Sequence, residues 1–173
     1  MLLKVEGGHF IMEKKKVKQL FSLTMIIIPW LSVLFMDKKS FLRYLPVASF
    51  VNLFISVFSV VSNKRRWWVN KNPFSPGNVD FSYILGPYFV ATLWIFKLTY
   101  GNFSKYLITN VLLNTLNAFP MAYTWEKVGT FKFKKINHVG WYFICILLSI
   151  IIYVYQYFVE KSILIQNKLK SEL

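Results

Sequence analysis

The sequence predicts an all-α protein, an integral membrane bundle of about five transmembrane helices. Of its 173 residues, 55% are hydrophobic and 19% are aromatic, and the mean hydropathy is +0.44. Charged residues make up only 16% of the chain, against about 25% in soluble domains. A helix needs about 20 mostly apolar residues to cross a bilayer. Five stretches come close to this length: 20–36, 44–61, 81–100, 106–123 and 141–159.

These stretches divide the chain into three parts. A basic N-terminal arm (1–19) precedes a single five-helix transmembrane domain (20–159), and a short polar C-terminal tail (160–173) follows it. We expect the true start at Met12, because Glu6-Gly7-Gly8 fits the codons of a ribosome-binding site at a suitable distance upstream. Residues 1–11 would then be a translated leader.

The first and third stretches should each form one helix that bends at a proline. The first follows a run of lysines, as in a signal peptide, but ends in Val33-Leu34-Phe35-Met36 without the small residues of a cleavage site. It therefore predicts an uncleaved helix. Asp80 stands directly before the third stretch, where an aspartate can cap a helix N-terminus. Pro29 and Pro87 lie well inside these two stretches and predict kinks.

The second, fourth and fifth stretches each carry polar side chains along one helical face. Asn52 belongs to a row of serines in the second, Asn110, Asn114 and Asn117 form a row in the fourth, and Gln156 belongs to a row in the fifth. Because such side chains avoid lipid, we expect these helices to form the interior of the bundle and the first and third to cover it. Helix–helix hydrogen bonding, a polar cavity and an oligomer interface all stay open as interpretations.

Lys97 and Glu160 are the ionisable residues nearest the apolar core. A charge inside a membrane is by default a functional hypothesis. Both lie toward the same end of their helices, near the level of Asn110, and are candidates for a pair in an outward-facing polar pocket. In the alternative interpretation, Lys97 extends to the lipid headgroups and Glu160 lies in water.

The formal charge of +14 comes from lysines and arginines at the ends of the apolar stretches. With the N-terminus in the cytoplasm, 13 of them lie on the cytoplasmic side and 8 outside, and the positive-inside rule favours this orientation. Their positions indicate anionic lipid headgroups as partners, and no nucleic acid. The candidate contact with anionic lipids is the cluster of Lys64, Arg65, Arg66, Trp67 and Trp68.

The sequence contains no catalytic, cofactor or metal signature. It has no His-x-x-x-His pair, no Gly-x-Ser-x-Gly motif and no glycine-rich phosphate loop. Cys145 is the single cysteine, and its position in the fifth stretch indicates apolar packing. His138 is expected to lie at the membrane interface as a cap. We therefore expect a protein that is not an enzyme and has no cofactor.

Three segments carry a resemblance to a known family: Lys64-Arg65-Arg66-Trp67-Trp68, Leu85-Gly86-Pro87-Tyr88-Phe89-Val90 and Trp94-Ile95-Phe96-Lys97-Leu98-Thr99-Tyr100-Gly101. They resemble small multi-pass membrane proteins of spore-forming Firmicutes, an uncharacterised family. The chain's use of Lys, Ile, Asn and Phe is similar to what their AT-rich genomes encode. The resemblance spans the end of the second stretch to the end of the third. It implies helical membrane topology and assigns neither an activity nor site residues.

Three classes of function follow from these features. The first is a non-catalytic accessory or scaffold component of the bacterial envelope or sporulation machinery, because the chain is small and lacks catalytic motifs. The alternative is a small transporter or solute-binding subunit with an amide-lined cavity. A membrane-embedded lipid-modifying enzyme fits worst. Expected partners are the lipids of the bacterial plasma membrane and other membrane proteins or a second copy, with the N-terminus cytoplasmic and the C-terminus outside.

Overall fold

The structure is a computed structural model that describes the backbone of residues 3–71 and 79–171 and the side chains of 16–71 and 79–165. The side chain of Met12, the expected start, lies outside the described residues. The elements are α1 (Leu3–Val33), α2 (Lys38–Lys64), β1 (Trp68–Asn70), α3 (Phe81–Tyr83), η1 (Ile84–Tyr88), α4 (Phe89–Thr99), α5 (Phe103–Leu116), η2 (Asn117–Met121), α6 (Ala122–Val128), β2 (Phe131–Phe133) and α7 (His138–Ser171).

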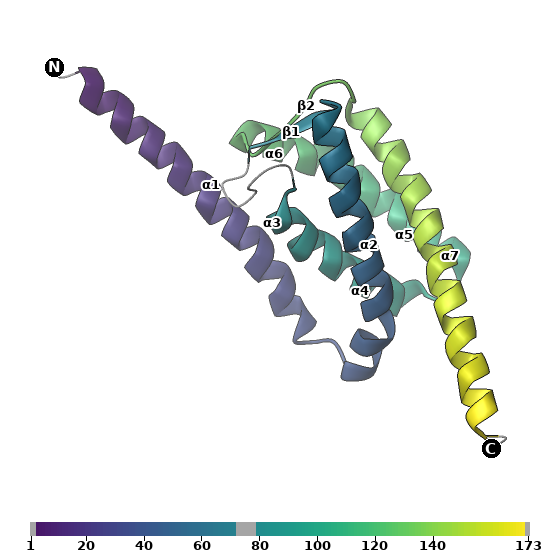
Figure 1. The fold of residues 1–173 in the computed structure, drawn as a ribbon. Coiled ribbons are helices and arrows are strands. Elements are labelled where there is room, and N and C mark those ends of the chain that lie inside the picture. Colours follow the sequence, from purple (N-terminus) through teal and green to yellow (C-terminus); the bar gives the residue numbers. More distant parts are fainter. Residues whose placement is uncertain (1–2, 72–78, 172–173) are drawn as a thin grey trace.

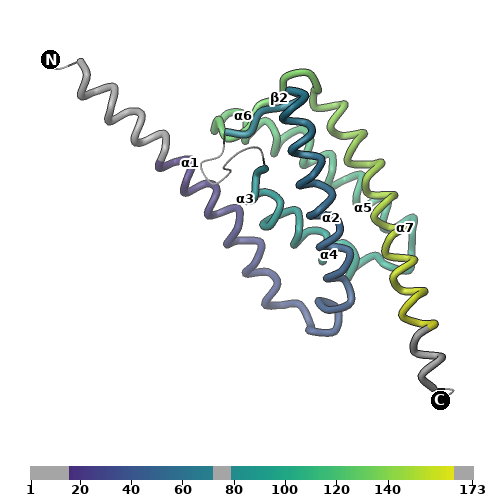
Figure 2. The backbone as a smooth tube through the Cα atoms, viewed as in Figure 1, coloured from purple at the N-terminus to yellow at the C-terminus, as the bar shows by residue number. Residues whose placement is uncertain are grey.

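All five apolar stretches are helical, which confirms the all-α prediction. The first, second and fifth lie in α1, α2 and α7, whereas the third is α3–η1–α4 and the fourth is α5–η2–α6. Four segments are long and apolar enough to cross a membrane: Lys16–Val33, Lys38–Lys64, Phe81–Thr99 and His138–Ile165. The fourth predicted stretch, with its three asparagines, is not among them. Successive long segments run back and forth along the bundle, and the termini lie at opposite ends (Figures 1 and 2).

Helix α4 lies at the centre of the bundle (Figure 1). It packs against α1, α2 and α5, and its side chains Leu93 and Phe96 are buried. The expectation that the third stretch only covers an interior made by the others is therefore wrong. The stretch is rich in large apolar side chains, and these fill the centre better than a polar row would. Helix α1 does cover the bundle from one side, and Ser22 is the only one of its described side chains that is buried.

A two-stranded antiparallel sheet closes one end of the bundle. β1 pairs with β2 so that Trp68 lies opposite Phe133 and Asn70 opposite Phe131. The sheet joins the segment after α2 to the segment before α7. It was not predicted, although Phe131 and Phe133 point one way while the lysines between and after them are exposed, which is the two-residue period of a strand.

Two helices contain π-helical turns at a proline. Pro87 lies in η1, where the backbone of Gly86 leaves the helical region, and Pro120 lies in η2. This confirms the bend predicted at Pro87, whereas α1 continues through Pro29 without a break. Asp80 caps the third stretch as expected, accepting a hydrogen bond from the backbone N–H of Tyr83 at 3.1 Å.

Gly86 allows α1 to approach η1 closely. A Cβ at this position would overlap the backbone carbonyl of Met25, and backbone cannot move aside as a flexible side chain can. We predict that Gly86→Ala lowers the free energy of unfolding by about 2 kcal/mol or more, measured by denaturation in detergent. The control is Gly140→Ala, where the nearest side-chain atoms lie 3.3 Å from the added Cβ. Equal stability of the two variants would contradict the close approach.

Candidate functional site

The asparagine row of the fourth stretch forms one wall of a cavity. Asn110 and Asn114 lie on α5 and Asn117 begins η2, at spacings of four and three residues that place them on one face. Asn110 and Asn117 are buried and Asn114 is half-buried. Ser149 of α7 faces this row, because its hydroxyl accepts a hydrogen bond from Asn114 Nδ2 at 3.2 Å and lies 3.1 Å from Asn110 Oδ1.

The opposite wall comes from the third stretch. Tyr83, Tyr88 and Thr92 line it together with Pro87 of η1. The Tyr83 hydroxyl donates a hydrogen bond to Asn117 Oδ1 at 3.2 Å. These tyrosines and the threonine were not predicted as site residues. They nevertheless place hydroxyl groups and aromatic rings opposite the amides.

The cavity between the two walls, which we call the amide pocket, has a volume of about 140 Å³. This is close to the ~150 Å³ of an engineered apolar cavity that holds benzene. None of its fifteen lining residues carries a charged side chain. Among the described residues, Asn114 Oδ1 and Asn117 Nδ2 have no hydrogen-bond partner. The amide pocket thus offers unused donors and acceptors in a part of the chain expected to lie within the membrane.

Two other predicted interior residues lie elsewhere. Asn52 is buried on α2, and its Oδ1 has no hydrogen-bond partner among the described residues. Gln156 is fully buried on α7, and its amide nitrogen Nε2 donates a hydrogen bond to Glu160 Oε1 at 3.0 Å. Neither residue lines the amide pocket. The predicted polar interior is therefore divided, because only three of its five predicted amide side chains, Asn110, Asn114 and Asn117, line the cavity.

Lys97 and Glu160 do not pair with each other. Arg43 of α2 binds Glu160 through two hydrogen bonds, from Nε at 2.5 Å and from Nη2 at 3.1 Å. Lys97 Nζ of α4 lies 2.8 Å from Asp37 Oδ1 in the turn between α1 and α2. We call these four residues the ionic clasp. The predicted pair is corrected because each charge meets a nearer partner of opposite sign, supplied by the turn and by the start of α2.

The ionic clasp changes the acid–base behaviour of Asp37. Its hydrogen bond with the Lys97 ammonium, helped by the backbone N–H of Ser40, holds the pKa of the Asp37 carboxyl well below its usual range. Since this pKa is lower in the folded state than in the unfolded state, the ion pair stabilises the fold at neutral pH. The contribution is lost as the pH falls through the folded-state pKa.

The predicted lipid-contact cluster separates into an exposed and a buried part. Lys64, Arg65 and Arg66 are exposed at the end of α2, and Trp67 is half-buried with the Arg65 guanidinium 5.9 Å from its ring centroid. Trp68 turns inward instead, with 4% of its surface exposed, because it starts β1 and packs on Trp141. Trp68 is therefore no candidate for a membrane-surface anchor, whereas the three basic residues stay candidates.

His138 and Cys145 belong to the framework of the bundle. His138 Nδ1 lies 2.7 Å from the carbonyl oxygen of Ala118 in η2, and Nε2 lies 3.6 Å from Glu126 Oε2. Cys145 is buried on α7. No cluster of three or more His, Cys, Asp or Glu side chains suited to a metal ion occurs among the residues that the structure describes.

Comparison of the chain with protein-family models, with curated proteins and with solved structures found no match.

The amide pocket can be tested through its access to water. In a Cys145→Ala background, which removes the single cysteine, we predict that the thiol of Asn114→Cys reacts with methyl methanethiosulfonate about tenfold faster than that of Leu112→Cys. The thiolate is the reactive form, and it forms in a polar pocket but not on the apolar outer face of α5, where Leu112 is 62% exposed. Equal reaction rates would show that no such pocket exists.

The ionic clasp predicts a specific charge rescue. Glu160→Arg leaves two cations together, and we expect it to lower the free energy of unfolding by about 1–3 kcal/mol, with partial recovery in the double variant Arg43→Glu/Glu160→Arg. The control is the corresponding swap Lys97→Glu/Glu160→Arg. It should give no recovery, because the two residues have different partners. Recovery in the control alone would contradict the described pairing, as judged by thermal unfolding in detergent.

Proposed function

We propose that the protein is a non-catalytic, five-span membrane component that binds a small uncharged polar solute in the amide pocket and serves its transport. The observation that carries the proposal is the convergence of three asparagines, Ser149 and three tyrosines on one cavity without a charged group. A binding site needs a few placed polar groups in a concave, partly apolar surface. An uncharged lining favours a neutral ligand, because burying an unpaired ion costs far more.

The unused hydrogen-bonding groups favour a solute over simple helix contact. Polar side chains that only join helices satisfy one another across the interface. Asn110 and Ser149 do so. In contrast, Asn114 Oδ1 and Asn117 Nδ2 have no hydrogen-bond partner among the described residues. Because an unsatisfied polar group in a membrane interior is costly, a polar occupant such as water or a small solute stabilises this arrangement.

The π-helical turns support the same proposal. Such turns appear frequently at functional sites, and both η1 and η2 line the amide pocket, through Pro87 and Tyr88 on one side and Asn117 and Met121 on the other. Each turn interrupts a helix at the level of the cavity. Where interrupted helices cross a membrane, irregular backbone is tolerated when it lines a cavity.

We place this component in a bacterial plasma membrane, with the N-terminus cytoplasmic and the C-terminus outside. The α5–η2–α6 segment would be the additional span, since it runs beside α4 and α7 and presents the exposed apolar side chains of Ile108, Leu112 and Leu116 on its outer face. Its amides then face the protein instead of lipid. The basic loops support the orientation, and Lys64, Arg65 and Arg66 would contact anionic headgroups on the cytoplasmic face.

An accessory or scaffold role is the second candidate. The observation in its favour is the large apolar surface of α1, where Ile27, Ile28 and Leu31 are all more than half exposed. Lipid covers such a surface in a membrane, and another membrane protein or a second copy of this chain is an alternative cover. This role does not need the amide pocket.

Solute flux separates the two candidates. The full-length protein is reconstituted into liposomes, and re-swelling is followed by stopped-flow light scattering in gradients of glycerol and of urea. We expect faster re-swelling than in protein-free vesicles, with Asn114→Leu lowering the protein-dependent rate about tenfold because it removes hydrogen bonds and fills the cavity. Thr115→Val is the control, since Thr115 is an exposed neighbour on α5. Absence of protein-dependent flux of both solutes would favour the accessory role.

A further inference from the structure

A larger space lies between α1 and the two π-helical turns. This space, which we call the α1 groove, has a volume of about 380 Å³ and is lined by ten residues of α1, η1, η2 and α6. It lies along the part of α1 that is apolar and long enough to cross a membrane, Lys16–Val33, so it would face the hydrocarbon core of a bilayer. Its apolar lining includes Phe21, Met25, Ile28, Pro87, Pro120 and Met121.

The hydroxyl groups in the α1 groove are already in use. Thr24 Oγ1 donates a hydrogen bond to the carbonyl oxygen of Leu20 at 2.9 Å, and Thr124 Oγ1 donates to the carbonyl oxygen of Pro120 at 2.9 Å. None of the ten lining residues carries a charged side chain. The groove therefore suits an alkyl chain.

The α1 groove is adjacent to the amide pocket, because Pro87 and Met121 line both spaces. The Pro87 side of this boundary is fixed, since α1 meets the neighbouring Gly86 backbone to backbone. Met121 is 39% exposed, and methionine is an unbranched, adaptable side chain. A change of rotamer at Met121 would therefore join the two spaces.

The two spaces differ in what they can bind. In the amide pocket, Asn114 Oδ1 is an acceptor and Asn117 Nδ2 is a donor, and both lack a hydrogen-bond partner among the described residues. An uncharged amide or hydroxyl group can both donate and accept, and so can satisfy both of them. The α1 groove next to it offers apolar contact only to a chain attached to such a group.

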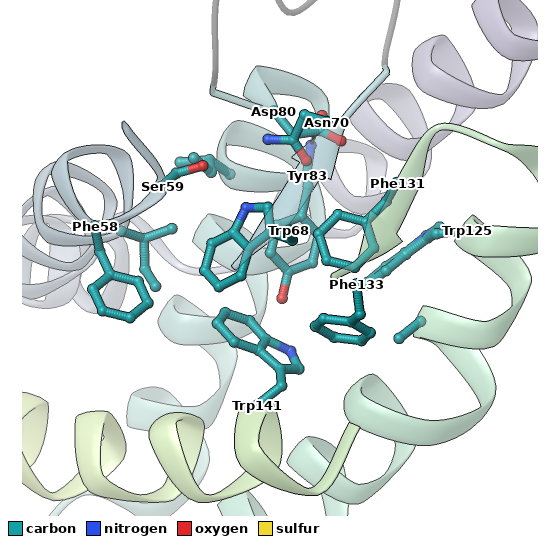
Figure 3. A pocket seen from close by; sticks show the side chains of 13 residues that line it. Phe58, Ser59, Trp68, Asn70, Asp80, Tyr83, Trp125, Phe131, Phe133 and Trp141 are labelled. Carbon is teal, nitrogen blue, oxygen red and sulfur yellow. Dashed lines mark hydrogen bonds between the residues drawn. The ribbon is translucent and has the colours of Figure 1, made fainter. Parts of the chain in front are cut away.

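The sheet end of the bundle leaves less room for a ligand. Trp125 lines the α1 groove and also belongs to the aromatic packing at the sheet end, where its ring centroid lies 4.9 Å from that of Tyr83. Figure 3 shows both rings among the other aromatic side chains there. The cavity between them has a volume of about 50 Å³, about a third of one that holds benzene. A ligand in the α1 groove therefore finds its larger continuation in the amide pocket.

We propose that the amide pocket and the α1 groove form one binding site for a neutral amphiphile, a molecule with an uncharged amide or hydroxyl head group and a single alkyl chain. The head group binds Asn114 and Asn117, the chain lies in the groove, and the molecule enters from the lipid past Met121. This inference rests on the proposed function, because it needs the amide pocket to accept an uncharged polar group. It adds that the ligand carries a chain and arrives through the membrane.

The experiment is photolabelling of the full-length protein in liposomes. The probe is a decanamide analogue with a diazirine in its chain, and labelled segments are mapped by mass spectrometry. Decanamide and decyltrimethylammonium compete at equal mole fractions in the lipid. We expect saturable labelling of residues 21–29 and 120–125, with decanamide at least about tenfold the stronger competitor, because the uncharged pocket disfavours an ion.

Other occupants of the α1 groove give different results. Lipid chains alone predict labelling that decanamide does not saturate. A second copy of the chain or another protein in the groove predicts no labelling there, while the other exposed faces of the helices are labelled. Either result would overturn the proposal.

Variants that fill the groove test the place of the chain. Thr24→Trp fills it from α1 and Thr124→Trp from α6, and each should lower the saturable labelling about fivefold or more, because overpacking excludes the chain. Leu23→Trp is the matched control, since Leu23 is an exposed neighbour on α1 outside the groove lining. Thermal unfolding reports whether each variant is folded. Unchanged labelling of folded Thr24→Trp and Thr124→Trp proteins would also contradict the proposal.

The flux assay in the same liposomes separates this inference from the proposed function. Asn114→Leu should lower both the flux of glycerol and urea and the labelling, whereas Thr24→Trp should lower only the labelling. Flux without saturable labelling would overturn the inference and leave the amide pocket as a site for small solutes. Saturable labelling without flux would support the amphiphile site and remove the transport role, and absence of both would overturn both proposals.

Discussion

The packing of α4 against α1, α2 and α5 is the constraint on which the rest of the structure depends. Leu93 and Phe96 are buried on all sides, so neighbouring helices must fit around them. The missing side chain of Gly86 brings α1 close to the start of this segment. At the other end, Lys97 reaches the turn before α2. Contacts at both ends of the third stretch therefore determine its position beside the fourth stretch. The amide pocket lies between these two stretches.

Polar groups are kept at particular levels of the bundle because few partners are available to them. The ionic clasp gathers its four charges at one end, where two of the side chains, Arg43 and Asp37, are about half exposed. The sheet satisfies backbone groups at the other end through pairs between β1 and β2. Between these ends, a charged side chain near the core would have to lose its hydration at a high cost in free energy. Neutral amides and hydroxyls occupy this middle level instead.

The sequence allowed the helices and the asparagine row to be predicted because both depend on local spacing. The spacing of Asn110, Asn114 and Asn117 determines that they share a face whatever surrounds them. It does not determine which helix lies opposite, and Tyr83 and Thr92 were missed for that reason. The predicted Lys97–Glu160 pair was wrong for a similar reason, since the partner of Glu160 depends on the position of α2 along α7. Only the sheet left a usable local signal, in the alternation of Phe131, Lys132 and Phe133.

Tyr83 lines both the amide pocket and a smaller cavity of about 50 Å³ at the sheet end of the bundle. The centroid of its ring lies 4.9 Å from that of Trp125 in the lining of the smaller cavity, while its hydroxyl donates to Asn117 in the wall of the amide pocket. A rotation of this ring would lengthen or break the hydrogen bond that shapes the amide pocket. Replacing Tyr83 with phenylalanine would keep the ring but remove the hydrogen bond, so the hydroxyl is the group that joins the ring packing at the sheet end to the wall of the amide pocket.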